Sequence, residues 1–576
     1  MKHIKDPGQK QLFDPFERLF SPLATKTIQD GWQGLFREVI LELMPAQIIA
    51  GKFNPSNGRP TKELYSVAGL IFISEFMDWT TEQAAQAYMF RTDIWYTLNL
   101  KPGAQSMSTR TIERYRKIFR ESELASKVMS DVTNSLVGLL ELSVTEQRLD
   151  STHVFSNMAT FGRTRLMGVT IKRFLTQLKR HGRNIFDTLP EELRERYGKS
   201  QNQLFADKSK DSKSLKLLRQ QVAEDMYFLI ERFSDEDRFS NRSTFRDLCT
   251  VFAQQCEITE EKVELRKETG GNVTQNPSDP DATYDGHKGP GYQVQLSETC
   301  SKDNKVQLIT SAIPQTACEQ DTDAVEKVRD DLRESDNLPE QMLADTSYGS
   351  DENVQSSLEK GGMNLVSPVS GKEPKSEISI CDFEIDEETN TVKVCPAGHK
   401  PFKSEYNSEK DITRTIMAIS VCSSCEKRKE CPIERKRNNC RFEFTTKELR
   451  LAKRRRFEKT DEFKAKYRKR SGIEATNSGI KRRTGMGKLR VRGRPAVFNA
   501  ILLKVAGWNI LQAARSMKIR EYVRKRVPWN SDDKVSAMIE SCSCAIRAQI
   551  RSSWKHIHLR MRNTHWIGKY QLQLVT

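Results

Sequence analysis

Apolar residues at helical spacing run through the first 135 residues of the chain. The pattern predicts an apolar helix over Leu64–Met77, a second helix opening at Thr80, and a third over Thr111–Arg120 with one basic and one apolar side. Three compact helices with basic faces are typical of a helix-turn-helix head, although a helical domain that only packs on the rest of the chain has the same pattern. Residues 1–135 are therefore predicted to be an all-α, DNA-binding N-terminal domain.

The spacing changes to strict alternation at Gln147–Phe155, which predicts a strand that carries Asp150. Residues 156–275 then return to helical spacing, ending in a predicted helix over Thr244–Lys267, and they are interpreted as an insertion after that strand. A hairpin of Tyr292–Thr299 and Lys305–Ile313 follows the turn residues of segment 275–282.

The chain then predicts a helix over Asp323–Glu334 and a short strand over Gln341–Ala344 that ends at Asp345. A later helix carries Glu474, and Phe498–Met517 is an apolar helix suited to covering a sheet. Strand–Asp, hairpin, helix, strand–Asp, helix–Glu is the order of a ribonuclease H-like core. The predicted fold class is therefore α/β, with a mixed-sheet catalytic domain over residues 145–515 that is interrupted by the helical insertion and a polar, cysteine-rich module over residues 370–445. A basic tail over residues 516–576 follows.

Charge is concentrated in one part of this layout. The 576-residue chain has a net charge of +17, and residues 441–494 hold 20 Lys and Arg against 6 Asp and Glu. Such a stretch attracts polyanions and adds salt-dependent affinity through counterion release, although a short charge run is often only a solvated surface. Because this run surrounds Glu474, we interpret it as binding nucleic acid.

Hydropathy argues for a soluble protein. Hydrophobic residues make up 37% of the chain, the mean hydropathy is −0.65, and no run of eighteen apolar residues occurs. The first residues, Met1 to Pro7, lack the apolar stretch of a signal peptide. We therefore expect no membrane span and a cytoplasmic location.

The most specific pattern is Tyr467-x2-Arg470-x3-Glu474-x6-Lys481. With about 100° per residue on a helix, these four side chains return to one face. A single carboxylate on so basic a face is expected where a metal ion meets phosphates. A salt-bridged surface helix, with Glu474 neutralised by Arg470 and Lys481, is the alternative.

Asp150, Asp345 and Glu474 are the candidate catalytic and metal-binding residues. Phosphodiester hydrolysis and strand transfer are served by two divalent cations, and hard ions such as Mg²⁺ or Mn²⁺ prefer oxygen ligands. Two strands and a facing helix could bring the three carboxylates to such a pair of ions. For Asp345, an ordinary helix N-cap is the alternative.

Further basic residues are candidate contacts to DNA phosphates. Tyr467, Arg470 and Lys481 would hold phosphates beside the metals, and an arginine can bind two oxygens at once. Past this helix, alternating cations predict an extended phosphate-binding segment; they are Lys488, Arg490, Arg492 and Arg494.

The cysteine-rich module predicts a structural zinc site. Cys395, Cys422, Cys425 and Cys431 supply four thiolates, two of them in a CxxC knuckle, and His399 and Cys440 are spare candidates. Four unligated thiols remain the alternative, and a redox CxxC pair is less favoured because no thioredoxin-like context surrounds it.

Taken together, these motifs resemble those of DDE transposases of bacterial insertion sequences. The resemblance covers roughly residues 30–515, and it rests on the Tyr467–Lys481 signature, on Leu149-Asp150-Ser-Thr-His and on Ala344-Asp345-Thr-Ser-Tyr-Gly. Many relatives have Gly where this chain has Ser151. The resemblance implies Mg²⁺-dependent cutting at the element ends and joining of the freed 3′-hydroxyl to target DNA. It also implies double-stranded DNA as partner, a homodimer on DNA, and a bacterial, nucleoid-associated location.

Two rival functions stay open. A ribonuclease H-like nuclease would cut without joining, and a catalytically inactive DNA-binding protein would do neither. Strand-transfer product from a pre-cleaved end separates transposition from plain cleavage, and replacing Asp150 by Asn separates catalysis from binding.

Overall fold

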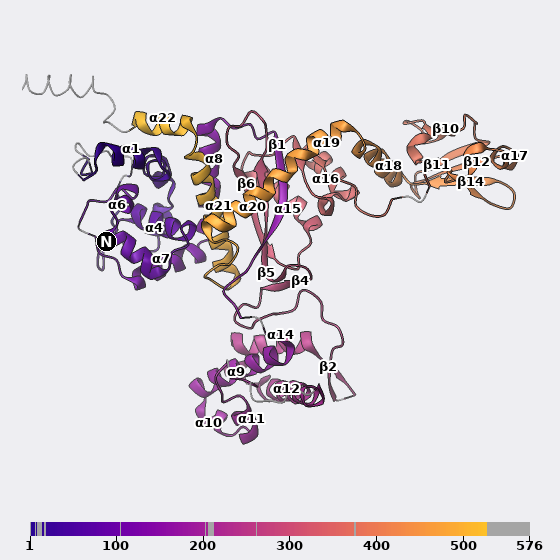
Figure 1. Ribbon diagram of the computed structural model, residues 1–576. Helices are drawn as coiled ribbons and strands as arrows, with labels where there is room; N and C mark the ends of the chain where they lie inside the picture. Colours follow the sequence, from indigo (N-terminus) through magenta and orange to yellow (C-terminus); the bar gives the residue numbers. More distant parts are fainter. Residues whose placement is uncertain are drawn as a thin grey trace, which may run out of the picture.

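The computed structural model describes residues 2–526, except for residues 6, 8–13, 17–18, 104, 160, 202, 206–211, 261 and 374–375. Most of the predicted basic tail, residues 527–576, lies outside the described residues. Figure 1 shows a central body of sheet and helices, a helical body below it and an arm built largely of strands at the right. The fold is mixed α/β, as the sequence predicts.

A six-stranded mixed sheet forms the centre. Its strands are β1 (Glu146–Val154), β4 (Thr283–Asp285), β5 (Gly289–Thr299), β6 (Ile309–Thr316), β7 (Gln341–Leu343) and β8 (Asn364–Val366). The order is β4-β5-β1-β7-β8, with β6 also paired to β5. β1, β5 and β6 pair antiparallel, whereas β1, β7 and β8 pair parallel. The predicted hairpin is confirmed, but its second strand begins at Ile309, four residues later than expected.

Helices precede this sheet in the chain. They are α1 (Pro22–Asp30), α2 (Trp32–Leu35), the π-helix η1 (Phe36–Ile40), the 3₁₀ turn η2 (Leu41–Leu43), α3 (Ala46–Ala50), α4 (Leu64–Phe76), α5 (Thr81–Phe90), α6 (Thr92–Thr97), α7 (Thr109–Glu121) and α8 (Leu124–Leu140). The predicted capping box is present, since Thr80 and Gln83 exchange side-chain and backbone hydrogen bonds at the start of α5. These helices pack on the sheet through one continuous hydrophobic cluster.

The long helix α21 (Arg494–Ala513) joins the N-terminal helices to the sheet. It contacts α4, α8 and β6. Gly507 allows the close approach to α4, because a Cβ there would overlap Phe76. The buried Asn509 amide pairs with both backbone groups of Ile309, at 2.9 and 2.7 Å, and so extends the hydrogen bonding at the start of β6. α22 (Met517–Arg526) follows α21 and ends the described part of the chain.

By length and composition α21 could cross a membrane, and 67% of its apolar window is buried inside the protein. The same composition is that of a core helix. α21 therefore serves as the core helix that the sequence predicts for covering the sheet.

Helices cover both sheet faces. Neighbouring residues on a strand point to opposite faces. Ala312 belongs to the cluster shared with the N-terminal helices, whereas Ile313 packs with a second cluster that includes α15 (Ala324–Glu334). α16 (Asp351–Gly361) packs against α15 and β8. The sheet thus lies between two helical layers.

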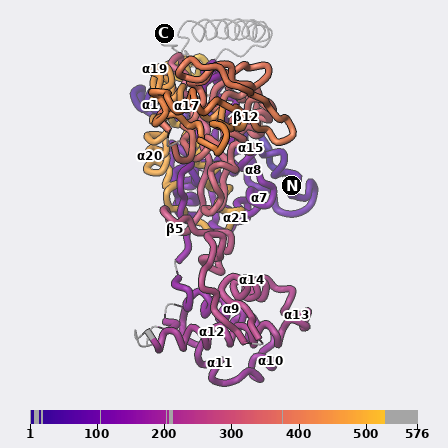
Figure 2. Tube along the Cα trace, turned by 90° about the vertical axis from the view of Figure 1, so that its right-hand side faces the viewer, coloured from indigo at the N-terminus to yellow at the C-terminus, as the bar shows by residue number. Residues whose placement is uncertain are grey.

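The helical insertion forms the lower body of Figures 1 and 2 and has its own hydrophobic cluster. It consists of α9 (Arg163–His181), α10 (Arg183–Asp187), α11 (Glu191–Arg196), α12 (Ser212–Phe233), α13 (Asp237–Ser240), α14 (Ser243–Gln255) and the hairpin β2 (Cys256–Thr259) and β3 (Lys262–Leu265). The predicted helix over Thr244–Lys267 is therefore wrong beyond Gln255. Glu260 has a φ of 48°, a left-handed turn conformation that ends any helix, and β-branched Ile258 and Val263 favour the strands.

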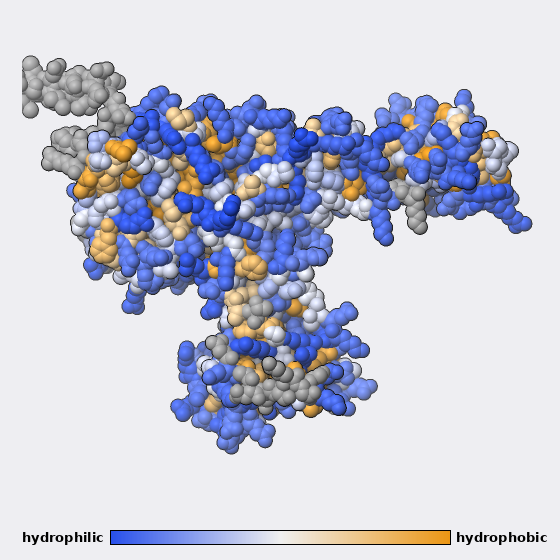
Figure 3. Space-filling model, in the orientation of Figure 1, coloured by the Kyte–Doolittle hydropathy of each residue, from blue (hydrophilic) through white to orange (hydrophobic). Residues whose placement is uncertain are grey.

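The arm corresponds to the cysteine-rich module. It contains η5 (Ile380–Asp382), β9 (Glu384–Ile385), β10 (Val392–Val394), β11 (Lys403–Asn407), β12 (Ile412–Met417), α17 (Ile419–Ser423), η6 (Glu426–Lys429), β13 (Glu434–Arg435) and β14 (Cys440–Phe444). β11-β12-β14-β13 form one sheet and β10-β9 another. The face of the molecule in Figure 3, arm included, is mostly hydrophilic, with small scattered apolar spots.

After the arm the chain returns to the central body through helices. These are α18 (Thr446–Glu458), α19 (Asp461–Tyr467), the 3₁₀ turn η7 (Arg468–Ser471) and α20 (Gly472–Thr484). α20 contacts β1 and α21, which brings the third predicted acidic residue to the sheet.

Candidate active site

Strand register brings the two aspartates together. β1 and β7 are parallel neighbours in which Glu146 pairs with Gln341 and Arg148 with Leu343. Continuing this register by two residues aligns Asp150 with Asp345, directly beyond the end of β7. Because alternate residues share a face, both carboxylates lie on the same side of the sheet edge.

Glu474 reaches the same place from α20, and one guanidinium contacts all three carboxylates. Arg470 Nη2 lies 3.0 Å from Asp150 Oδ1 and 3.4 Å from Asp345 Oδ2, and its Nη1 lies 3.4 Å from Glu474 Oε1. The Arg470 and Asp150 side chains are only 13% and 17% exposed, whereas Glu474 is 67% exposed. Three acidic residues from distant parts of the chain therefore converge on Arg470.

Buried contacts hold α20 and η7 against the sheet. Arg148 pairs with Glu298 of β5 at 2.6 Å and donates to the Lys469 carbonyl at 2.9 Å. Thr476 donates to the other Glu298 oxygen at 2.7 Å. A Cβ on Gly472 would overlap the Arg148 guanidinium, so the glycine allows this contact. The position of Arg470 is thus set by a buried ion pair beneath it.

Burial and neighbouring charges shift the pKa values of Asp150 and Arg470. Burial raises the pKa of Asp150, repulsion from Asp345 and Asp321 adds to the effect, and Arg470 opposes it. For Arg470, burial disfavours the charged form, but attraction to Asp150 and Asp345 outweighs it, so the pKa of the guanidinium lies above its ordinary value. Arg470 therefore stays cationic and favours an ionised Asp150.

The structure contains part of each alternative role predicted for the acidic residues, namely Asp345 as an N-cap and Glu474 as a partner in salt bridges. Thr346 N donates to Asp345 Oδ1 at 2.6 Å, which is the N-cap contact, while the other oxygen faces Arg470. The Arg470–Glu474 pair exists, but among the described residues no ion pair joins Lys481 to Glu474. Instead burial and repulsion from Lys288 lower the pKa of Lys481, and attraction to Asp150 opposes the shift.

Three further side chains border the site and were missed from sequence. Asn477 donates to Asp150 Oδ2 at 3.0 Å. Lys288 lies 3.5 Å from Ser151 Oγ. Asp321, in the turn η3 (Asp321–Asp323), accepts from Ser151 at 3.3 Å and from Ser347 at 3.5 Å. Only the position of Asn477 one turn after Glu474 was available as a sequence signal.

Asp321 belongs to a buried polar network under the two aspartates. Gln295 Nε2 donates to Asp321 Oδ1 at 2.9 Å, and Tyr348 donates to Gln295 Oε1 at 2.5 Å. Ser151 and Ser347 follow the catalytic candidates Asp150 and Asp345 by one and two residues. Asp321 thus connects the strand that carries Asp150 to the turn that carries Asp345.

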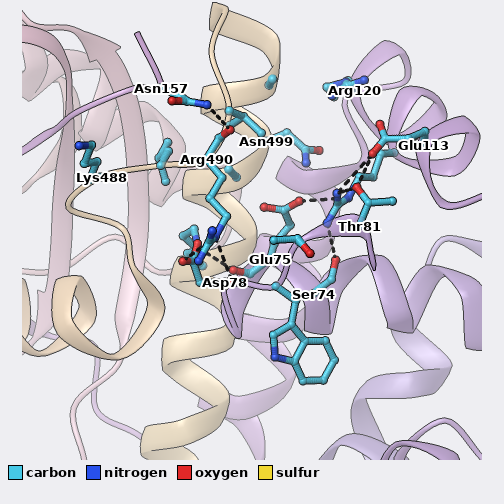
Figure 4. Close-up of a pocket in the computed structure, with 18 of the residues that line it drawn as sticks. Ser74, Glu75, Asp78, Thr81, Glu113, Arg120, Asn157, Lys488, Arg490 and Asn499 are labelled. Atoms are coloured by element: carbon cyan, nitrogen blue, oxygen red, sulfur yellow. Dashed lines mark hydrogen bonds and ion pairs between the residues drawn. The ribbon is translucent and has the colours of Figure 1, made fainter. Parts of the chain in front are cut away.

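The other predicted phosphate contacts are Tyr467 and the extended segment from Lys488 to Arg494. Tyr467 is half-buried and stacks on Phe463, with ring centroids 5.4 Å apart. The cations Lys488, Arg490, Arg492 and Arg494 are all exposed, and Leu489 between the first two is buried. The extended segment runs beside the end of β1, with Leu489 N bonded to Phe155 O at 2.8 Å, and ends where Arg494 begins α21. Arg490 pairs with Asp78 at 2.9 Å (Figure 4).

Within the described ranges, no group of three or more His, Cys, Asp and Glu side chains forms an arrangement that could hold a metal ion. At the carboxylates the donor chemistry suits hard divalent cations, and all three carboxylates contact the Arg470 guanidinium.

In the arm, Cys395, Cys422, Cys425 and Cys431 line one small cavity together with His399. Burial and repulsion from Cys440 raise the pKa of the Cys422 thiol in the metal-free protein. Since a bound zinc ion itself lowers the pKa of a coordinating thiol, this shift does not bear on zinc binding. The predicted zinc site therefore stays a prediction.

Comparisons with known proteins agree with part of this picture. Residues 394–514, about a fifth of the chain, match the family model of the transposase DDE domain. This span holds Arg470 and Glu474, whereas Asp150 and Asp345 precede it. No curated protein matches the chain.

Among solved structures, the cryo-EM structure of a piggyBac transposase synaptic complex with hairpin DNA is similar at 10% identity, over 65% of this chain and 73% of that chain. Its TM-score of 0.19 is too low to carry an argument about the fold. The match of residues 394–514 to the transposase DDE domain, by contrast, includes the segment that delivers Glu474 to the two aspartates, and it supports a DDE transposase.

Proposed function

We propose that this protein is a DNA transposase that cleaves the ends of an insertion sequence and joins the 3′ ends to target DNA. The observation that carries the proposal is the convergence of Asp150, Asp345 and Glu474 on Arg470. Arg470 and Glu474 lie in the segment that is similar to the DDE domain. The strand order β6-β5-β1-β7-β8, with three antiparallel and then two parallel strands, supports a ribonuclease H-like core.

The site residues have distinct tasks in this proposal. Asp150, Asp345 and Glu474 would hold two Mg²⁺ or Mn²⁺ ions, which when bound supply charge neutralisation at the attacking and leaving oxygens. Arg470 keeps Asp150 ionised and presents a cationic fork to a phosphate. Asn477 fixes the second oxygen of Asp150, and Lys288 and Lys481 add positive charge beside it.

Several finer assignments belong to the same proposal. Double-stranded DNA is the partner, the active species is a homodimer on DNA, and the protein works in the bacterial cytoplasm at the nucleoid. Zinc in the arm stays a prediction from the cysteine spacing alone.

Strand transfer tests the proposed reaction. With a pre-cleaved element end, a target duplex and Mg²⁺, we expect a product in which the 3′ end is covalently joined to the target, resolved on a denaturing gel. An end that carries a 3′-deoxy terminus is the matched control and should give no joined product. Cleavage without joining would instead identify a nuclease. If the protein neither cleaves nor joins DNA, the remaining function is DNA binding without catalysis.

Asp321 is expected to act as a positioning residue for the cleavage reaction. Replacing Asp321 by Ala removes the acceptor that Ser151 and Ser347 share, so the two aspartates lose a common support. Since misplacement by about 1 Å can cost roughly a hundredfold in rate, we expect cleavage to fall by about 10- to 100-fold.

Asp323→Ala, in the same turn and exposed, is the matched control and should cleave at the parent rate. The diagnostic measurement is the Mg²⁺ concentration for half-maximal cleavage, which should rise in Asp321→Ala because the carboxylates are less well placed. A fall in rate with an unchanged Mg²⁺ dependence would contradict the positioning role.

A further inference from the structure

Part of the basic run lies on α18, where some of its charged side chains contact the protein itself. Figure 1 shows α18 between the arm and the central body. Arg450, Arg454 and Glu458 follow one another by four residues, so they share one face of this helix. This face, called the core face of α18 below, contacts the segments that follow β7 and β8.

A different face of α18 belongs to the arm. Leu449 is buried in the hydrophobic cluster of the arm. Lys453 pairs with Glu387 at 2.9 Å, and Arg456 pairs with Asp382 at 2.7 Å. The helix α18 is therefore attached to the arm through one face and to the central body through another.

Arg454 lies at the centre of the core face. Its Nη2 donates to the Gly349 carbonyl at 3.0 Å and to the Ser367 carbonyl at 3.1 Å. Gly349 follows β7 and Ser367 follows β8, so one guanidinium nitrogen bridges the segments at the ends of two neighbouring parallel strands.

Two further contacts flank Arg454 and hold α18 in place. Arg450 Nη2 lies 2.6 Å from Asp351 Oδ2, and the Asp351 side chain is only 4% exposed. Glu458 Oε1 accepts a hydrogen bond from the Val369 amide at 2.5 Å. The position of Arg454 is thus fixed from both ends of the core face.

The two segments that Arg454 bridges are those that hold Asp345. Ser367 Oγ donates to the Asp345 carbonyl at 2.6 Å. Asp345 begins and Gly349 ends the 3₁₀ turn η4 (Thr346–Tyr348), and a Cβ on Gly349 would overlap Ser367 Oγ. The first amide of this turn binds Asp345 Oδ1 at 2.6 Å. The position of the turn therefore sets the direction of the Asp345 carboxylate.

The charge of Arg454 strengthens the bridge. Burial lowers the pKa of Arg454, and attraction to Asp351 and Glu458 opposes the shift. A buried cation costs free energy unless it is paired or hydrogen-bonded. Hydrogen bonds from a charged donor are roughly twice as strong as neutral ones, so the two carbonyls are held more firmly than a neutral side chain would hold them.

We propose that Arg454 is a positioning residue for Asp345, because it fixes the turn that presents this carboxylate to the active site. For the reaction that is served, the inference rests on the proposed function. The bridge itself does not depend on which reaction takes place. Since α18 is also attached to the arm, the arm and the second aspartate share one support.

Arg454→Gln tests the proposal in the full chain. In EDTA, amide hydrogen exchange of residues 345–349 should be at least about tenfold faster, because both carbonyls lose a hydrogen bond from a charged donor. Exchange in the helical insertion, which has its own hydrophobic cluster, should stay at the parent rate. Mn²⁺ affinity, measured by calorimetry without DNA, should fall severalfold, and cleavage with Mg²⁺ should fall by about 10- to 100-fold. Arg454→Lys keeps the charge and a donor, and should recover part of each loss.

Arg333→Gln is the matched control, since Arg333 is an exposed arginine of α15 that also donates to a backbone carbonyl, that of Lys360. It should keep the parent values of exchange at residues 345–349, of Mn²⁺ affinity and of cleavage.

Unchanged exchange at residues 345–349 in Arg454→Gln would overturn the proposal, and so would an increase spread over the whole chain. Faster local exchange with parent Mn²⁺ affinity and parent cleavage would also overturn it, because Arg454 would then only attach α18. A parent protein that neither binds Mn²⁺ nor cleaves DNA would instead refute the proposed function, and the exchange rates alone would then decide whether Arg454 fixes the turn.

Discussion

Replacing Asp150 by Asn is expected to slow DNA cleavage by about 10³-fold while duplex binding is retained. The change removes one negative charge from the point where β1, β7 and α20 meet, and with it a ligand for the proposed metal pair. Loss of about 4 kcal/mol of charge stabilisation corresponds to this factor, at about 1.4 kcal/mol for each tenfold change in rate. Asn keeps the size of the side chain, and Arg470 keeps its ion pairs with Asp345 and Glu474, so the protein should still fold.

Cleavage of a labelled element end with Mg²⁺, alongside anisotropy binding in EDTA, measures the two properties independently. Asp303→Asn, an exposed carboxylate in the β5–β6 turn, should keep the parent rate. If Asp150→Asn still cleaves at the parent rate, Asp150 is not a metal ligand. If it loses binding as well, the residue has a structural role.

Replacing Arg470 by Ala is expected to lower the free energy of unfolding by about 2–3 kcal/mol near neutral pH. Removing one partner of a buried ion pair leaves the other charge uncompensated, and such changes cost about 3–5 kcal/mol in fully buried cases. Arg470 and Asp150 retain some exposure, which reduces the effect. Cleavage should also fall, because the guanidinium proposed to hold a phosphate is gone.

The pH dependence of the stability loss in Arg470→Ala shows whether the loss comes from the charge of Asp150. The folded-state pKa of Asp150 is already raised, and without Arg470 it rises further. A carboxyl group with a raised folded-state pKa contributes stability below its unfolded-state pKa and loses it as the pH increases through the folded-state value. The deficit of Arg470→Ala, measured by denaturant unfolding, should therefore be larger at neutral than at mildly acidic pH.

Arg468→Ala, an exposed cation in the same turn, should change stability by less than about 0.5 kcal/mol. In the Asp150→Asn background, Arg470→Ala should cost less than in the parent, because its main partner is already neutral. Equal losses in both backgrounds, or a deficit independent of pH, would show that Arg470 contributes by packing.

The spacing of apolar and polar residues correctly predicted those helices and strands that depend only on residues close together in the sequence. The alternation around Asp150, the capping box at Thr80 and the apolar stretch of α21 each depend on neighbouring residues, and each element is present. A Cβ at Gly472 would overlap Arg148 and one at Gly479 would overlap Trp508, so both glycines allow α20 to pack closely. The helix predicted through Lys267 failed because a single turn at Glu260 reverses the chain, and helical spacing does not reveal such a turn.

The amino-acid sequence alone determined most of the strand and helix order and the three acidic candidates. The single helical face predicted for Tyr467, Arg470, Glu474 and Lys481 is wrong, because the 3₁₀ turn η7 separates Tyr467 at the end of α19 from Glu474 in α20. Tertiary structure decided that Arg470 lies among the acidic residues, that Asp321 supports two of them, and that Arg490 faces Asp78. The physical reason is distance along the chain: these contacts join residues tens to hundreds of positions apart. Spacing within a helix or strand constrains only near neighbours, whereas strand register and core packing select which distant side chains meet.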